Sequence, residues 1–230
     1  MKKSLFPRLA LMAVVVALVS ACSEKKFEYT NVIPANASTV VSINMKSQVD
    51  KSGLIDYENI EVQQKLTDAM KSGMNAATFQ QVEMIMKDPK KSGIDVSAPL
   101  YVFNTETFPT TVIAKVSNED DLHALLETLE KEKVCQPLAS GDGFQFTQMG
   151  NQVFMAYTPS VLMLTNYKGT TQLEKIKQDI PALLKQTNEN SIVSTAVFKK
   201  MQKMGGDIDA MLSPASLIGP YANMIKESDM

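Results

Sequence analysis

The sequence predicts an α+β fold in which an antiparallel sheet carries helices packed on one face. Short runs of β-branched and aromatic residues, bounded by turn residues, predict strands in the middle of the chain. Longer segments with apolar residues three and four positions apart predict amphipathic helices before and after those strands. Strands that follow one another directly are typical of antiparallel neighbours, and the helices are then available to cover the sheet.

The first half of the predicted domain alternates between strand and helix. A buried strand is expected at 38–45, because its central residues form a β-branched run. Two amphipathic helices are expected at 62–70 and 79–86, and the second must end before Pro89.

Two neighbouring antiparallel strands are expected next, at 100–103 and 110–116. A helix follows, with Ser117 or Asn118 as its cap. Leucines at helical spacing between Leu122 and Leu129 give this helix the clearest amphipathic stripe of the chain.

The second half divides into a strand region and a helical region. A three-stranded meander, separated by glycine, asparagine and proline turns, is expected at 144–149, 152–157 and 161–165. Helices, and no further strands, are expected at 171–184, 192–204 and 207–212. Thr171 and Glu174 suit a capping box, and Pro181 is predicted to kink or split the first of these helices.

The N-terminus has the anatomy of a signal peptide. A basic start precedes an uncharged stretch at 9–23, and small residues stand directly before Cys22. The stretch is too short for a transmembrane helix, which needs roughly 20 apolar residues. We therefore expect residues 1–21 to be a signal peptide that is cut between Ala21 and Cys22.

The sequence Ser20-Ala21-Cys22 resembles the processing site of bacterial lipoproteins. In these proteins the cysteine carries a diacylglyceryl thioether and usually an N-acyl chain such as palmitate. One acyl chain holds a protein only marginally and two hold it stably, so the resemblance implies a permanent membrane anchor at Cys22. The alternative is an ordinary secretory signal that happens to be followed by cysteine.

Residues 22–31 are polar and are expected to form a tether, which spans at most roughly 30 Å when fully extended. The α+β domain is expected over 32–230, a length that suits one substantial domain. The tail ends in helix-like residues without a cap, as expected if this domain is the N-terminal part of a longer protein.

Charge and composition argue against nucleic acid as a partner. Without the leader the chain has 20 basic and 25 acidic residues, and it has neither arginine nor tryptophan. A nucleic-acid binder normally presents a basic patch, and arginine is the preferred group for phosphate and guanine. With Cys22 acylated, Cys135 is the one free thiol, so no intrachain disulfide is expected and Cys135 is predicted to be a buried hydrophobe.

The block Val32–Asn44, with Met45-Lys46-Ser47 and Lys51-Ser52-Gly53-Leu54 after it, resembles the opening of a family of Bacteroidales lipoproteins that is classed as a domain of unknown function. Residues 148–165 match the later strand pattern of that family. The resemblance implies an α+β lipoprotein of the outer membrane, usually in a longer chain, without assigned catalytic residues. The segment Ser23-Glu24-Lys25-Lys26 lacks an acidic cluster of the kind found in surface lipoproteins, which favours a periplasm-facing position over the cell surface.

Few residues are candidates for chemistry. His123 is the sole histidine and lies at the margin of the leucine stripe, where a solvated position is expected rather than catalysis. Asp207 and Asp209 begin like a calcium loop, but Met211 stands where the next oxygen ligand is needed. They are therefore predicted to be an acid pair at a helix start.

Two further groups of residues are candidates for chemistry. Pairs of methionines could bind Cu(I), namely Met84 with Met86 and Met201 with Met204. Core packing is the preferred interpretation, since methionine commonly fills irregular gaps. The acidic run Glu119–Asp121 could hold carboxylates for glycoside cleavage, but it is better placed to stabilise a helix N-terminus.

These observations predict a non-catalytic binding or structural module of the cell envelope, attached to a membrane through its lipid anchor. A protein, peptide or glycan is the expected partner, and no catalytic residue, metal site or cofactor is assigned. Two alternatives stay open: an envelope hydrolase acting on glycan or peptide, and a methionine-rich protein that handles metal ions.

Overall fold

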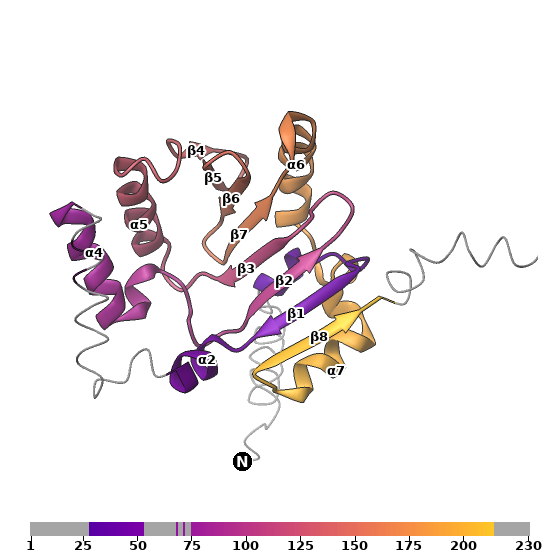
Figure 1. Cartoon of the computed structure of the whole chain (residues 1–230). Coiled ribbons are helices and arrows are strands. Elements are labelled where there is room, and N and C mark those ends of the chain that lie inside the picture. Colours follow the sequence, from indigo (N-terminus) through magenta and orange to yellow (C-terminus); the bar gives the residue numbers. More distant parts are fainter. Residues whose placement is uncertain (1–27, 53–67, 69–70, 72–74, 214–230) are drawn as a thin grey trace, which may run out of the picture.

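The computed structural model describes residues 28–52, 68, 71 and 75–213. Its strands are β1 (Thr39–Ile43), β2 (Leu100–Asn104), β3 (Thr111–Lys115), β4 (Ala139–Ser140), β5 (Gln145–Met149), β6 (Val153–Tyr157), β7 (Val161–Asn166) and β8 (Ile208–Leu212). They form one sheet in the order β4-β5-β6-β7-β3-β2-β1-β8, and every neighbouring pair is antiparallel (Figure 1). The predicted α+β class and antiparallel sheet are confirmed.

The α-helices in the described residues are α2 (Met45–Ser52), α4 (Ala76–Lys87), α5 (Glu119–Lys131), α6 (Gly169–Leu184) and α7 (Ala196–Met204). Short 3₁₀ helices are η1 (Tyr29–Val32), η2 (Pro89–Ser92), η3 (Asn188–Asn190) and η4 (Ile192–Ser194). The helices expected from 79 to 86 and from 122 to 129 are confirmed as α4 and α5, while most of the helix expected at 62–70 falls outside the described residues.

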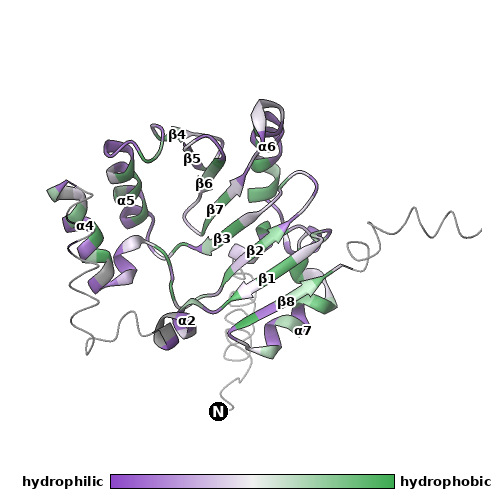
Figure 2. Ribbon diagram, in the orientation of Figure 1, coloured by the Kyte–Doolittle hydropathy of each residue, from purple (hydrophilic) through white to green (hydrophobic). Residues whose placement is uncertain are grey.

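The larger core lies between one face of the sheet and the pair α6 and α7. Alternate strand residues such as Phe103 and Phe154 meet Ile176 and Ile180 of α6 and Phe198 of α7, and all five are at most 1% exposed. Figure 2 shows hydrophobic residues on the strands and on these helices. Burial of such side chains stabilises the fold by about 1.5–3 kcal/mol each.

The opposite face carries a second, smaller core, so the expectation of helices on one face only is not met. Leu122 and Leu126 of α5 pack there against Met155 and Leu162, the strand residues that alternate with those of the first core. Because β6 and β7 are apolar on both sides, each face of that part of the sheet needs a helix to cover it.

Local interactions explain where α5 begins. Asn118 is its cap, since the Oδ1 atom accepts hydrogen bonds from the backbone N–H of Asp120 at 3.0 Å and Asp121 at 3.2 Å. Gly93 lies against the same turn with φ of 77°, and an added Cβ would stand 2.4 Å from Asn118 O and Leu122 N. Glycine is required here by both backbone conformation and space.

Helix α6 starts and continues differently from the prediction. It begins at Gly169, and the side chain of Gln172 accepts from Lys168 N at 2.6 Å, so the expected capping box is not what opens it. Pro181 lies inside α6 without splitting it, because the helix runs to Leu184. A proline within a helix removes one backbone bond, and the apolar face of α6 compensates by burial in the first core.

The segment 207–212 was expected to be helical, and this is wrong: it forms the edge strand β8, paired with β1. Val40 lies opposite Met211, and Ser42 lies opposite Asp209. The sequence pattern misled the prediction because the buried position holds Asp209, while the apolar residues Ile208 and Leu212 are exposed.

The folded domain starts earlier than expected. Thr30, Asn31 and Val32 in η1 are buried, and Tyr29 Oη donates to Pro99 O at 2.8 Å. The last three residues assigned to the tether, 29–31, therefore belong to the domain. Within the ranges that the structure describes, no helix is long and apolar enough to span a bilayer.

Candidate functional site

A cavity of about 620 Å³ opens on the face of the sheet covered by α7, near the end of that helix. It lies where η1, α7 and strands β1, β2, β3 and β8 meet. The polar side chains that line it are Glu28, Tyr29, Thr30, Ser42, Asn44, Tyr101, Lys115, Ser160, Gln202 and Asp209. Its volume falls within the range of about 300–1,000 Å³ that is typical of ligand pockets.

One wall of the cavity is aromatic. The ring centroids of Tyr29 and Tyr101 lie 5.9 Å apart, and Tyr101 lies 5.6 Å from Phe198 of α7. The hydrogen bond from Tyr29 Oη to Pro99 O fixes the first ring. Burial, followed by the nearby Tyr101 and Asp95, raises the pKa of Tyr29, so this phenol stays protonated and is no activated nucleophile.

Asp209 supplies a carboxylate to the cavity from the second position of β8. The residue is 9% exposed, and it is the only buried carboxylate or amine among the described residues. Within the described part of the chain, the one hydrogen bond to its carboxylate comes from Gly206 N, which donates to Oδ2 at 2.9 Å. No described cation forms an ion pair with it. A buried carboxylate of this kind is costly unless a donor or cation reaches it.

The two glycines after α7 set the position of Asp209. Gly205 closes the helix in the left-handed conformation, with φ of 64°. Gly206 then passes so close that a Cβ there would lie 2.6 Å from Asp209 Oδ1. The Gly205-Gly206 pair thus ends α7, lets the chain turn into β8 and leaves room for the carboxylate.

Lys115 is the cationic side chain that lines the cavity, and it forms an ion pair with Asp95, which is not part of the lining. Lys115 Nζ lies 2.8 Å from Asp95 Oδ2, and Asp95 also accepts from Ser97 Oγ at 2.5 Å. These bonds hold the pKa of Asp95 at about 2. Because Lys115 is neutralised by Asp95, the charge that the cavity presents is dominated by Asp209 and Glu28.

The site offers hydroxyls, amides, two carboxylates and an aromatic wall, and these groups bind by hydrogen bonding and charge. Ser42 and Ser160 lie in the cavity, but a serine nucleophile needs a neighbouring base. The sole histidine of the chain is on α5, which packs on the opposite face of the sheet. A Ser-His arrangement therefore cannot form in this cavity.

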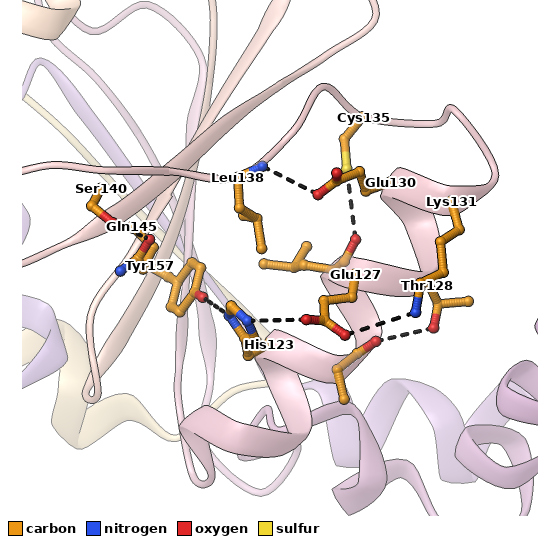
Figure 3. A network of polar contacts seen from close by, with 12 residues as sticks. His123, Glu127, Thr128, Glu130, Lys131, Cys135, Leu138, Ser140, Gln145 and Tyr157 are labelled. Atoms are coloured by element: carbon orange, nitrogen blue, oxygen red, sulfur yellow. Dashed lines mark hydrogen bonds and ion pairs between the residues drawn. The ribbon is translucent and has the colours of Figure 1, made fainter.

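His123 has a structural partner that the sequence did not reveal. Figure 3 shows it between Tyr157 and Glu127: Nδ1 lies 2.7 Å from Tyr157 Oη, and Nε2 lies 3.5 Å from Glu127 Oε1. Its side chain is 45% exposed, as expected for a flank position. Burial raises the pKa of Tyr157, so this phenol is not an activated nucleophile.

Asp207 and Asp209 do not form the predicted helix start. Asp207 precedes β8 and bonds to Ser47 Oγ and Lys51 Nζ of α2, whereas Asp209 faces the cavity. The contacts with Lys51 and Ser47 lower the pKa of Asp207. In the described residues, no three His, Cys, Asp or Glu side chains gather in a way that could hold a metal ion.

Of the two methionine pairs, only Met201 and Met204 have both side chains among the described residues, and these two differ in burial. Met201 is buried in the first core at 3% exposure, while Met204 is 63% exposed. Met84 is 51% exposed, and the side chain of Met86 lies outside the described set. The packing role expected for methionine is confirmed at Met201.

The remaining candidates have structural roles. The acidic run Glu119–Asp121 forms the first turn of α5, as expected. Cys135 is 6% exposed, and burial raises the pKa of its thiol, so it is a buried hydrophobe. The signal cleavage site Ala21-Cys22 and the lipidation site Cys22 lie outside the described residues.

The residues of the cavity were not found from the sequence. They come from segments that are far apart in the chain, and their meeting depends on the pairing of β8 with β1. The one local signal was Gly205-Gly206 followed three residues later by Asp209, a turn that brings a carboxylate back toward a helix end.

No curated protein matches the sequence. Among solved structures, the chain is similar to the one described as "Structure of crystal form III of TP0453", with 8% identity and a TM-score of 0.43 over 87% of this chain and 69% of that chain. That similarity is too low to support an inference. A family model described as "Domain of unknown function (DUF4836)" matches residues 29–226, which is most of the chain and begins at the first residue of η1. The chain belongs to the DUF4836 family.

Proposed function

We propose that the protein is a lipid-anchored binding module of the cell envelope, and that its cavity takes a ligand carrying a protonated amine. The ligand class is inferred from Asp209, a carboxylate that is nine-tenths buried in the cavity wall. No cationic side chain among the described residues forms an ion pair with it. A ligand ammonium group would supply the missing charge and hydrogen bonds.

The other lining groups suit the rest of such a ligand. Tyr29 and Tyr101 offer apolar faces with hydroxyl edges, and Asn44 and Gln202 add amide donors and acceptors. Amines of this size occur in short peptides and in amino sugars, and both are available in an envelope. Both classes of ligand carry an amine, and binding measurements with peptides and with amino sugars distinguish between them.

Binding by the full chain is tested with pairs of ligands that differ only in acetylation. Short peptides with free and acetylated N-termini form one set, and glucosamine oligomers with their N-acetylated forms make the other. We expect the free amines of one set to bind, and Asp209→Asn to weaken that binding by about tenfold or more, which is about 1.4 kcal/mol. The variant keeps an oxygen that can accept from Gly206 N.

Asp142→Asn is the matched control, because this carboxylate is exposed and lies in the turn before β5. It should leave the affinity unchanged. Equal affinity for amine and acetylated ligands, or equal loss in both variants, would refute the proposed ligand class.

The anchor part of the proposal rests on the leader and on Cys22. The leader is followed by small residues and a cysteine, and the net negative charge of the rest of the chain is consistent with a partner other than nucleic acid. We propose an outer-membrane position that faces the periplasm. Intact-mass measurement of protein from its native host tests the anchor: it should lack residues 1–21 and gain the mass of a diacylglyceryl group with an N-acyl chain.

Glycan hydrolysis is the second candidate, because two carboxylates, Glu28 and Asp209, line the same cavity. Paired carboxylates are the groups that glycoside hydrolases use. Turnover of a glycan that is abolished by both Glu28→Gln and Asp209→Asn would replace the binding proposal by this one. Binding without turnover would support the binding module.

A further inference from the structure

The edge strand β8 leaves one row of backbone groups without a strand partner in the described part of the chain. Two bonds fix its orientation: Asn44 N donates to Asp207 O at 2.8 Å, and Ser213 N donates to Ser38 O at 2.8 Å. In an antiparallel pair, alternate residues direct both N–H and C=O to the same neighbour. Residues 207, 209, 211 and 213 therefore face β1, and the groups of Ile208, Ala210 and Leu212 point away from the sheet.

The side chains at these three positions are apolar and exposed. Ile208 is 59% and Leu212 is 52% exposed, and Ala210 between them is also exposed. Sheet edges are usually protected by lysine, proline or a bulge. Within Ile208–Leu212 there is no lysine or proline, and the one charged residue, Asp209, turns toward the cavity. Figure 2 shows hydrophobic residues on this strand at the end of the sheet.

We propose that β8 is the interface through which two copies of this chain form a dimer, by joining their sheets antiparallel. The exposed apolar positions of the edge are arranged symmetrically about Ala210. With a two-fold axis at that residue, Ala210 lies opposite its own equivalent, and Ile208 lies opposite Leu212 of the second copy. Such an isologous contact closes with two subunits, and each strand then has a partner on both sides.

Helix α7 extends this surface on the other face. Phe198 and Met201 point into the core and Gln202 lines the cavity over the inner strands. Val197 and Met204 are seven residues apart, so they share the flank away from Gln202, and they are 57% and 63% exposed. Figure 1 shows α7 beside β8 at this end of the sheet. In the dimer the two α7 helices would approach through these flanks.

The size of the interface sets its strength. A standard interface has about 20–30 residues on each side, and one five-residue strand with one helix flank provides fewer. Lys200 also stands on the flank between Val197 and Met204, so two like charges approach. The dimer is therefore weak in solution. If the anchor proposed above holds both copies in one membrane, their effective concentration rises and the dimer is favoured there.

Register-specific cysteines test the pairing in the full chain, in the membranes of cells that produce it. In the proposed register the Cα atoms of Ala210 and its equivalent are about 5.5 Å apart, within the 4.4–6.8 Å that a disulfide spans. Ala210→Cys should form a covalent dimer when copper-phenanthroline is added as oxidant. Residues two positions from the axis are offset by four residues, about 13 Å, so Ile208→Cys alone and Leu212→Cys alone should not cross-link.

A mixture of chains carrying Ile208→Cys and chains carrying Leu212→Cys should cross-link, because these positions face each other in the dimer. Wild type, with buried Cys135, is the background control. Cross-linking of all variants to the same extent would mean random collision and overturn the proposal. So would the absence of a dimer for Ala210→Cys, or its cross-linking to a different protein.

A second variant tests the interface without cysteine. Ala210→Pro removes an outward N–H and leaves the bonds to β1 in place, so the fold is preserved. Sedimentation of the full chain in detergent should show a concentration-dependent dimer for wild type and a monomer for Ala210→Pro. Amine binding by the cavity should be the same in both, which separates failure of this inference from failure of the proposed function. A wild type that stays monomeric, or a variant that dimerises equally, would overturn the inference.

Discussion

The phenol of Tyr157 and the imidazole of His123 are joined by a contact of 2.7 Å between Oη and Nδ1, which links β6 to α5. Tyr157 is 1% exposed, and burial, with Glu119 and Glu127 nearby, raises its pKa. The phenol therefore stays protonated, and it can donate to Nδ1 when the imidazole is the tautomer with its proton on Nε2. With its proton on Nε2, the imidazole can donate to Glu127 on the other side. The half-exposed histidine thus satisfies a hydroxyl that would otherwise be buried without a partner.

The variant His123→Ala should lose more folding stability than the variant Tyr157→Phe. His123→Ala leaves the Tyr157 hydroxyl without its acceptor, and we expect the free energy of unfolding to fall by about 1–3 kcal/mol. Tyr157→Phe removes the donor as well, so the double variant should be about as stable as Tyr157→Phe alone. Urea denaturation of the four proteins measures the coupling. Additive losses would show that the contact contributes nothing.

Two glycines with positive φ should respond differently to alanine. Gly93 and Gly143 have φ of 77° and 82°, so alanine is strained at both by about 1–2 kcal/mol. An added Cβ meets open space at Gly143, but at Gly93 it would stand 2.4 Å from Asn118 O and Leu122 N. We expect Gly93→Ala to lower the melting temperature clearly more than Gly143→Ala. Similar melting temperatures would mean that the first turn of α5 can move away at little cost.

Most of the fold could be predicted from the sequence, because local patterns determine it. Strands β1 to β3 and the meander β5 to β7 have β-branched or aromatic runs between turns, and α5 and α6 have regular apolar stripes. Strand β8 could not be predicted, since its alternation places Asp209 inside and Ile208 outside. Its pairing with β1 is a contact between residues far apart in the sequence, and a local pattern of residues does not predict such contacts.

The candidate site could not be predicted from the sequence for the same reason. Asp209 belongs to the mispredicted strand, and Tyr29 was assigned to the tether. Tyr101 was placed correctly in a strand, but its neighbours in the cavity come from both ends of the chain. The role of His123 was likewise hidden, because Tyr157 contacts it from a separate element.

The ion pair of Asp95 with Lys115 predicts a pH-dependent stability. The pKa of Asp95 is about 2 in the folded protein, below its ordinary value of 3.8, because Lys115 and Ser97 bond to the carboxylate. A depressed pKa contributes stability above pH 4, and this is lost as the pH falls from about 4 to 2. We expect Asp95→Asn to cost about 1 kcal/mol at pH 7, allowing for solvent screening of a partly exposed pair.

The same variant should approach the stability of wild type at pH 2, where the carboxylate of Asp95 is about half protonated in the folded protein and almost fully protonated in the unfolded chain. Urea denaturation at pH 7, 4 and 2 follows the difference between the two proteins. Ser97→Ala is the matched control, because it removes the 2.5 Å hydrogen bond to Asp95 Oδ1 and keeps Lys115 in place. Ser97→Ala should lose less folding free energy than Asp95→Asn over the same pH range. A difference between Asp95→Asn and wild type that does not change with pH would exclude this pair as its source.

Counting thiols tests the burial of Cys135 and the proposed lipidation of Cys22 in one measurement. Cys135 is 6% exposed and burial raises the pKa of its thiol, so the folded protein should react with a thiol reagent only as fast as it unfolds. In denaturant, protein from the native host should show one thiol per chain if Cys22 carries a thioether. Cys135→Ser should then show none. Two thiols per denatured chain would disprove the anchor, while rapid reaction of the folded protein at one thiol would disprove the burial of Cys135.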